Sequence, residues 1–199
     1  MNFGEYVEGH RQLIYSTICK YVPLKGKEGQ ANAIMREYID RQGKYTRPGL
    51  LMLAGQLYGA KVEDLILPAA AQQVSEDWIL MQDDAGDDSE MRRGKPAIQK
   101  IHGWVQVMNA SNAGQMAMWR MLKDYMLQVG DKKGDMLYEK FYDMLNCTVE
   151  AQHIENQFIH RTKSMKHSDE TLFMRIANGK TCYYKIGRAS CRERVCQYV

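Results

Sequence analysis

The chain has 199 residues, 45% of them hydrophobic, and a formal net charge of +3, which suits one globular domain with a substantial core. Acidic and basic residues are interspersed, so the concentrated basic surface typical of nucleic-acid binding is not predicted. No apolar run is long enough to cross a bilayer, and the N-terminus lacks a basic segment followed by an apolar core. The five cysteines are an odd number without CxxC spacing. We therefore expect a cytoplasmic protein with reduced thiols and no membrane span.

Helical periodicity of apolar residues dominates the sequence, and no convincing alternating strand is found. Prolines and short glycine-containing turn signals separate the helical segments. The predicted fold class is all-α, a large and mostly antiparallel helical bundle with a central cavity. The expected helices are, in chain order, Phe3–Tyr21, Gly29–Gln42, Pro48–Leu57, Pro68–Met91, Ile98–Gln128, Met136–Arg161 and Asp169–Tyr184.

The end of the sequence differs in character from the rest, with small, basic and cysteine residues and no apolar periodicity. Residues 186–195, IGRASCRERV, are what results from translating, in one reading frame, a DNA sequence that resembles the adapters used in a common sequencing chemistry. A genuine basic tail is the alternative, but a ten-residue match makes coincidence the weaker explanation. We expect residues 1–185 to be the natural domain, and residues 186–199 to be a non-native tail.

The stretch QDDAGDDSEMRRGKPA, residues 82–97, concentrates opposed charges directly after an apolar run. Residues three and four apart share a helix face, so Asp83 and Asp87 should point the same way and repel each other. Clustered carboxylates suit Mg²⁺, which shares its coordination with substrate phosphates. Arg92 and Arg93 offer planar donors to phosphate oxygens. A solvated acidic helix end is the alternative, but the apolar residues before the aspartates favour a ligand with a diphosphate head and a hydrocarbon tail.

With these residues in view, the sequence resembles the trans-isoprenyl diphosphate synthases, the family of farnesyl and geranylgeranyl diphosphate synthases. LMQDDAGDDSEMRRGKP is similar to their first aspartate-rich motif, DDxxD followed by RRGxP. Further similar segments are GKYTRP at residues 43–48, VMNA at 107–110, AQHIE at 151–155 and the pair Lys180-Thr181. Each segment alone is weak, but together they occur in family order, which makes the combination specific.

The resemblance implies a prenyltransferase of isoprenoid biosynthesis that condenses isopentenyl diphosphate with an allylic diphosphate. It also implies Mg²⁺ as the cofactor and a homodimer. The implied metal ligands are Asp83, Asp84 and Asp87. The residues implied near the allylic diphosphate and the developing cation are Arg92, Lys180 and Thr181. The residues implied to hold isopentenyl diphosphate are Lys44, Arg47 and Arg93, with Glu76 and Gln152 as further substrate-binding positions.

The product length is predicted from the residues below the aspartates. Ile79 lies one turn before Asp83, about 6 Å away at roughly 1.5 Å per residue, and Trp78 is beside it. By analogy with how this family limits elongation, bulk at that depth should stop the growing tail early. Trp78 and Ile79 are therefore the expected chain-length wall, and a short product of C15 to C20 is expected.

Two departures from the family pattern affect the expected activity. Glu76 stands where the family often carries His or Gln, and a carboxylate facing a diphosphate requires protonation or a cationic neighbour. The family's second aspartate-rich motif would follow Lys180 and is not in the sequence. We therefore expect a C-terminally incomplete chain that is inactive by itself.

Two other functions remain as alternatives to the synthase. A class I terpene cyclase shares metal-bound aspartates but needs no second diphosphate site, so Lys44, Arg47 and Arg93 favour the synthase. A non-catalytic subunit of a prenyl synthase would retain the fold and modulate a partner. Intact aspartates and arginines argue against that subunit, while Glu76 leaves it open.

Overall fold

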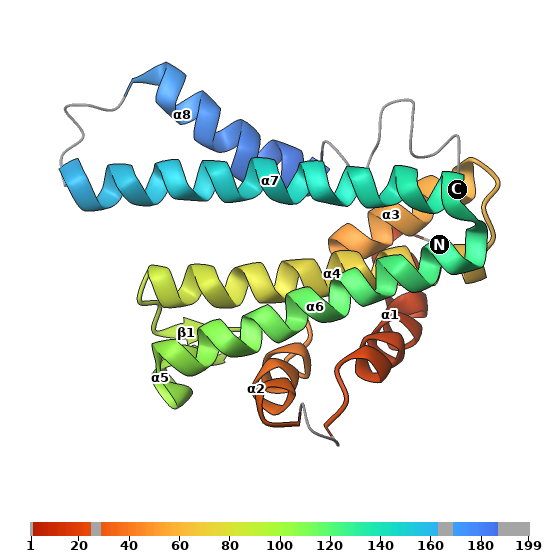
Figure 1. The fold of residues 1–199 in the computed structure, drawn as a ribbon, viewed down its shortest axis with the longest axis horizontal. Coiled ribbons are helices and arrows are strands. Elements are labelled where there is room, and N and C mark those ends of the chain that lie inside the picture. Colours follow the sequence, from red (N-terminus) through yellow and green to blue (C-terminus); the bar gives the residue numbers. More distant parts are fainter. Residues whose placement is uncertain (1, 25–28, 163–168, 187–199) are drawn as a thin grey trace.

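A computed structural model describes residues 2–24, 29–162 and 169–186 of the protein (Figure 1). The helices are α1 (Phe3–Tyr21), α2 (Gly29–Ile39), α3 (Thr46–Leu57), α4 (Val62–Gly86), α5 (Ile98–His102), α6 (Trp104–Val129), α7 (Asp131–Thr162), α8 (Glu170–Ile176) and the π-helix η2 (Ala177–Ile186). A short antiparallel hairpin, β1 (Met91–Arg92) and β2 (Lys95–Pro96), joins α4 to α5. The all-α fold class is confirmed. The expected non-native tail lies outside the described residues, except for Ile186.

The first helix has the bounds that the sequence predicts, because both of its ends carry clear local signals. The Asn2 side chain accepts a hydrogen bond from the Glu5 backbone at 3.0 Å, and the Glu5 carboxylate accepts one from the Asn2 backbone at 3.0 Å. This reciprocal capping satisfies two donors that a helix start leaves without intrahelical partners. Pro23 follows the end of the helix and cannot extend it.

The central helix α4 begins and ends earlier than predicted. It starts at Val62, and Pro68 lies inside it, so the prediction that this proline begins the helix is wrong. A proline removes one helical hydrogen bond, but α4 packs against α1, α3 and α6, which hold it on several sides. The helix ends at Gly86 and not at Met91, because Asp88 adopts a left-handed φ of 52° that a helix cannot continue through.

Two further boundaries differ from the sequence prediction for reasons of backbone conformation. The helix expected over 98–128 is divided into α5 and α6 at Gly103, whose φ of 79° and ψ of 155° interrupt the helical hydrogen bonds. The last predicted helix changes from α8 into the π-helix η2 at Ala177. A switch to π geometry has no sequence signal of its own, and such segments are frequent at functional sites.

The core forms where α4 packs against α6 (Figure 1). Small residues in the middle of α4, Ala69, Ala70 and Ala71, are fully buried. On α6, a Cβ atom added to Gly114 would lie 3.1 Å from the Cβ atom of Trp78, so the two helices meet closely there. Figure 1 shows α7 above α4 and α6 and roughly parallel to α4, with α8 beside it. None of the described helices combines the length and apolar character needed to cross a bilayer.

The space around two glycines, Gly134 beside the turn between α6 and α7 and Gly9 on α1, predicts opposite effects of their substitution. A Cβ atom added to Gly134 would lie 2.4 Å from the Cα atom of Met126, so Gly134→Ala should force the helices apart and cost about 1–3 kcal/mol. Gly9, exposed on α1, has nothing within 4 Å of an added Cβ atom. Gly9→Ala should therefore stabilise by about 0.5–1 kcal/mol. Urea unfolding monitored by circular dichroism measures both, and a shift of both midpoints in the same direction would contradict this packing.

Candidate active site

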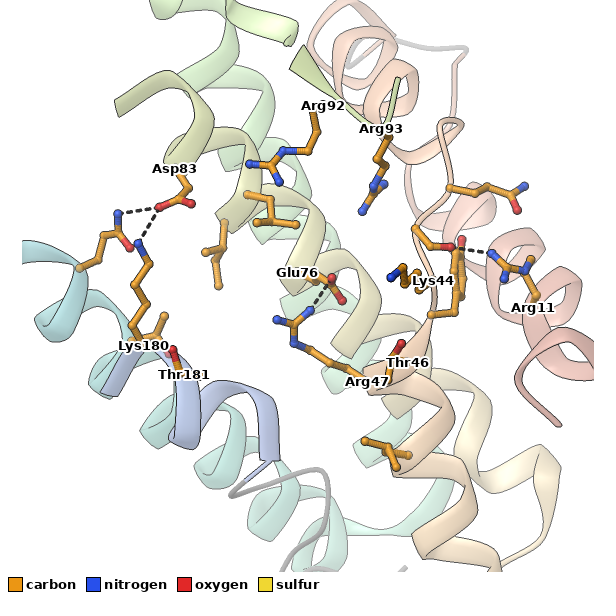
Figure 2. Close-up of a pocket in the computed structure, with 18 residues that line it drawn as sticks. Arg11, Lys44, Thr46, Arg47, Glu76, Asp83, Arg92, Arg93, Lys180 and Thr181 are labelled. Carbon is orange, nitrogen blue, oxygen red and sulfur yellow. Dashed lines mark hydrogen bonds and ion pairs between the residues drawn. The ribbon is translucent and has the colours of Figure 1, made fainter. Parts of the chain in front are cut away.

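A pocket of about 920 Å³ lies between α4 and the elements around it (Figure 2). Its walls come from α1, the loop before α3, α3, α4, the hairpin, α7 and η2. The described charged residues that line it are six bases and two acids: Arg11, Lys44, Arg47, Arg92, Arg93, Lys180, Glu76 and Asp83. This excess of positive charge in a concave site favours a polyanionic ligand.

One face of α4 supplies the central wall of the pocket. Glu76, Ile79, Leu80 and Asp83 line it, with the spacing of three and four residues that places side chains on one helix face. Trp78 does not line this pocket: its side chain is 4% exposed and packs in the core beside α6. Of the two residues expected to limit tail length, α4 therefore brings Ile79 to the pocket wall and turns Trp78 away.

The acidic end of α4 meets residues of α7 and η2. One Asp83 oxygen accepts hydrogen bonds from the Gln152 amide at 2.8 Å and from the Lys180 ammonium at 3.1 Å (Figure 2). Lys180 also pairs with Glu155 on α7. Burial opposes the charge on Lys180, yet its hydrogen bonds to Glu155 and Asp83 raise its pKa above the ordinary value. Lys180 is therefore held as a cation between two carboxylates.

Asp87 caps the C-terminus of α4, one turn beyond Asp83, and its backbone N–H donates to the Asp83 carbonyl at 2.8 Å. Partial burial, followed by the charge of Asp83, raises the pKa of Asp87. The repulsion expected between these two carboxylates is thus present, although Asp87 is not among the residues that line the pocket. A cation bound by both would relieve it.

Asp84 points into the protein, where it holds Arg92. Its side chain is 1% exposed, and both of its oxygens accept hydrogen bonds from the Arg92 guanidinium, at 2.8 and 2.9 Å from Nε. The Gln99 amide of α5 donates to the backbone carbonyls of Asp84 and Ser89 at 2.8 and 2.7 Å, which ties α5 to the end of α4 and the loop after it. The metal-binding role that the resemblance implies for Asp84 stays a prediction.

The second hairpin arginine, Arg93, is fixed by a buried carboxylate. Its Nη2 atom lies 2.8 Å from an oxygen of Asp77, and its guanidinium lies 4.9 Å from the ring centroid of Tyr38. Gly43 leaves room for this side chain, since a Cβ atom there would lie 2.8 Å from Arg93 Nη2. The glycine of the GKYTRP segment thus lies in close contact with an arginine of the RRG segment fifty residues further along, and a side chain there would displace the Arg93 guanidinium.

Arg47 at the start of α3 pairs with Glu76 of α4, as Figure 2 shows. Both side chains are 15% exposed, so the pair is largely shielded from water. The cationic neighbour that a carboxylate at this position requires is therefore Arg47. Lys44 lines the same pocket, and no hydrogen bond or ion pair holds it within the part of the chain that the structure describes.

A family model described as polyprenyl synthetase matches residues 28–195, which includes every segment just described except α1. The chain belongs to the polyprenyl synthetase family. The pocket thus gathers residues from family segments that are far apart in sequence: GKYTRP, the aspartate-rich motif, AQHIE and the pair Lys180-Thr181.

Relatives of known function are similar over part of their length. The chain is 33% identical to the geranylgeranyl diphosphate synthase of Methanosarcina mazei over 98 residues, 49% of this chain and 30% of that protein. It is 33% identical to the farnesyl diphosphate synthase of Escherichia coli over 93 residues, 45% of this chain and 31% of that protein.

The solved structure of a geranylgeranyl pyrophosphate synthetase from Pyrococcus horikoshii has the same fold, with a TM-score of 0.86 at 22% identity. That alignment covers 99% of this chain and 57% of the other. The chain thus spans less than two thirds of the length of each of these relatives.

The donor set at the end of α4 fits a magnesium ion that also binds its substrate. Within residues 2–24, 29–162 and 169–186, no three His, Cys, Asp or Glu side chains gather to hold a metal alone. Asp83 and Asp87 offer two hard oxygen donors that repel each other, and Mg²⁺ is commonly bound by one or two carboxylates together with substrate phosphates. The site therefore suits a metal that arrives with a phosphate ligand.

Several pocket residues carry no signal in the sequence. Arg11 of α1 donates to the Gly43 carbonyl at 2.6 Å and lies 5.1 Å from the ring centroid of Tyr45. Tyr45 adopts a left-handed φ of 54°. Gln42, Thr46, Leu50 and Thr148 also line the pocket. The contact of Arg11 joins residues 32 apart in the chain, so only the packing of α1 reveals it.

The buried Asp77 predicts a pH dependence of stability. Burial raises its pKa to about 7, although Arg93 opposes the rise. The folded state then keeps a proton that the unfolded chain releases near pH 4, so the contribution of Asp77 is lost as pH rises from about 4 to about 7. Asp77→Asn removes this titration but retains an acceptor for Arg93. Its free energy of unfolding relative to wild type should rise by on the order of 3 kcal/mol across this interval.

Urea unfolding of both proteins at several pH values between 4.5 and 7.5 measures this difference. Arg93 stays charged throughout this range, so its own titration adds no pH dependence to the difference. A difference that does not change with pH would show that Asp77 is ionised in the folded protein over the whole interval.

Proposed function

We propose that the protein containing this chain is a prenyltransferase that condenses isopentenyl diphosphate with an allylic diphosphate to a C15 to C20 isoprenyl diphosphate. The observation that carries this proposal is a single pocket with two groups of cations at different places on its wall. Figure 2 shows Lys180 beside Asp83 on one side and Lys44 and Arg11 on the other. Two diphosphate-binding regions distinguish a condensing enzyme from a terpene cyclase, which needs one.

The region around Asp83 suits the allylic diphosphate. Asp83 and Asp87 would hold Mg²⁺, which supplies charge neutralisation for the leaving diphosphate when bound. Arg92 and Lys180 line the pocket as cations, and Thr181 contributes a hydroxyl to the same pocket. Gln152, expected to bind substrate, donates to Asp83 and would orient this carboxylate.

The region around Lys44 suits isopentenyl diphosphate. Lys44, Arg47 and Arg93 all line the pocket there. Asp77 fixes the Arg93 guanidinium, which lowers the entropy lost when an anion binds to it. Arg11 sits against Gly43 and would keep the loop that carries Lys44 in place.

The chemistry requires each type of residue present. In the allylic substrate the C–O bond breaks and its electron pair leaves with the diphosphate, which Arg92 and Lys180 stabilise electrostatically. The double bond of isopentenyl diphosphate then forms the new C–C bond, and a proton is lost from the product. The apolar wall residues Ile79, Leu80 and Leu50 exclude water that would capture the allylic cation.

The test is a product analysis of the whole protein with isopentenyl diphosphate, geranyl diphosphate and Mg²⁺. A C15 or C20 diphosphate that incorporates isopentenyl carbons is expected, and Asp83→Asn should reduce its formation by at least 100-fold. A cyclic hydrocarbon formed without isopentenyl diphosphate would identify a terpene cyclase. A protein that shows no turnover by itself but stimulates a partner synthase would be identified as a non-catalytic subunit.

The described cysteines Cys19, Cys147 and Cys182 are free, which supports a reducing compartment such as the cytoplasm.

The pocket wall predicts which residue limits the product length. Ile79→Ala opens space on the pocket face of α4, so we expect the product distribution to shift toward longer chains. Trp78→Ala should leave product length unchanged and instead destabilise the protein by about 3–5 kcal/mol, because Trp78 is buried in the core. Liquid chromatography of the dephosphorylated products separates these effects. Longer products from Trp78→Ala and not from Ile79→Ala would reverse the assignment.

We also propose a homodimer formed through α5 and α6. Five large apolar side chains of these helices are exposed by half or more: Ile101, Trp104, Val105, Met116 and Leu127. Val105 and Met116 are about three helical turns apart on one face of α6. The double variant Val105→Lys/Met116→Lys should therefore halve the mass that light scattering measures for the whole protein. An unchanged mass would exclude this face as the interface.

A further inference from the structure

Glu76 places a negative charge inside the region proposed to receive isopentenyl diphosphate. It lines the pocket together with Lys44, Arg47 and Arg93, and it is ion-paired with Arg47. Its neighbour in sequence, Asp77, pairs with Arg93. In this region three cations therefore face two carboxylates, and Lys44 has no acidic partner among the described residues.

We propose that Glu76 is a specificity-determining residue, whose carboxylate competes with an incoming diphosphate for Arg47 and so lowers the affinity of this region for polyanions. The inference rests on the proposed function, because it assumes that this region receives a diphosphate. It goes further in giving Glu76 a role opposite to that of its cationic neighbours: its removal should tighten binding.

The geometry favours competition between Glu76 and the ligand for Arg47 over a role in which Glu76 only holds Arg47 in position. An arginine held by a largely shielded carboxylate must exchange or share that partner before it binds another anion. Glu76 and Arg47 are each 15% exposed, so solvent screens their interaction only in part. Glu76 also acts on Arg93: burial lowers the pKa of that guanidinium, Asp77 is the main group that raises it, and the charge of Glu76 adds a smaller increase. One carboxylate thus affects two of the three cations.

An electrostatic role has a signature that a packing role lacks. The energy between Glu76 and a ligand scales with the charge of the ligand, so removal of the carboxylate should favour diphosphate more than phosphate. The gain should also shrink with added salt, because the pocket is open to solvent and its charges are partly screened. A change in shape alone would affect the two anions without this order and without this salt dependence.

The experiment is isothermal titration calorimetry of the 199-residue chain with inorganic diphosphate and inorganic phosphate, in buffer containing EDTA. Without metal, Asp83 and Asp87 repel anions, so binding reports chiefly on the region of Lys44, Arg47 and Arg93. Glu76→Gln keeps an acceptor for Arg47 and removes the charge. We expect roughly tenfold tighter binding of diphosphate and about threefold tighter binding of phosphate at low salt, both smaller at 0.5 M salt.

Glu63→Gln is the matched control. Glu63 lies on the same helix, thirteen residues before Glu76 and therefore about 20 Å away along the axis. It is exposed and does not line the pocket. The substitution makes the same change in net charge, and we expect it to leave both affinities unchanged. An equal gain in Glu63→Gln would mean that overall charge, and not the position of Glu76, determines binding.

A double-mutant cycle with Arg47 locates the effect. Arg47→Gln should weaken diphosphate binding by more than tenfold, because it removes a cation and leaves Glu76 without this partner. The double variant Glu76→Gln/Arg47→Gln should recover part of this loss. Competition for Arg47 predicts that the gain from Glu76→Gln is smaller in this background than in the wild-type chain. An equal or larger gain would show that Glu76 repels the ligand directly and does not act through Arg47, and would overturn the proposal.

The outcomes separate this inference from the function on which it rests. If the wild-type chain and Glu76→Gln both fail to bind diphosphate, the proposed diphosphate region itself is wrong. If wild type binds diphosphate and Glu76→Gln binds it equally or more weakly, the region is supported and the competing role of Glu76 is rejected. Weaker binding in that variant would instead mean that Glu76 holds Arg47 in position for the ligand.

Discussion

Four carboxylates of α4 each pair with a cation from another element, and the pocket depends on these pairs. Glu76 pairs with Arg47 of α3, and Asp77 with Arg93 after β1. Further along the same helix, the partners of Asp83 and Asp84 are Lys180 of η2 and Arg92 of β1. These contacts connect segments up to 97 residues apart. A buried charge is costly unless it is paired, so the acidic face of α4 can be accommodated only when the basic elements surround it.

This arrangement brings the cations into the pocket already partnered. A preorganised arginine or lysine loses less entropy when it binds an anion, but it must also give up or share its carboxylate. The balance differs along the helix. Asp77 and Asp84 are each 1% exposed and hold their arginines from behind, away from the pocket lining. Glu76 and Asp83 line the pocket itself, so they share the space of the ligand with the cations they hold. Asp77 and Asp84 therefore orient cations, whereas Glu76 and Asp83 also interact directly with a ligand in the pocket.

The sequence predicts this site well wherever a local rule determines the geometry. Helical spacing places Gln73, Glu76, Leu80, Asp83 and Asp87 on one face. The structure brings Glu76, Leu80 and Asp83 to the pocket, whereas Gln73 is fully buried and Asp87 does not line it. Spacing does not separate Trp78 from Ile79, because adjacent residues differ by about 100° around a helix and either could face a cavity until the neighbours are known. The position of α6 decides this, since Trp78 packs beside Gly114.

Other features could not be read from the sequence because they depend on tertiary contacts or on unusual backbone. Arg92 lies in β1 and Arg93 in the turn after it with a φ of 54°, and the two reach carboxylates seven residues apart on α4. No pattern in RRG indicates which arginine meets which aspartate.

The position of Lys180 similarly requires the π-helix and its close contact with α7. A Cβ atom added to Gly179 would lie 2.5 Å from the Cβ atom of Ala151, so a glycine permits η2 to approach α7 closely. This approach places Lys180 between Asp83 and Glu155, and its charge then balances the carboxylate at which the proposed metal would bind. The proposed metal ion and the Lys180 ammonium would compete for the same negative charge at Asp83. A diphosphate that received both cations would resolve this competition, because it would supply the additional negative charge that two neighbouring cations require.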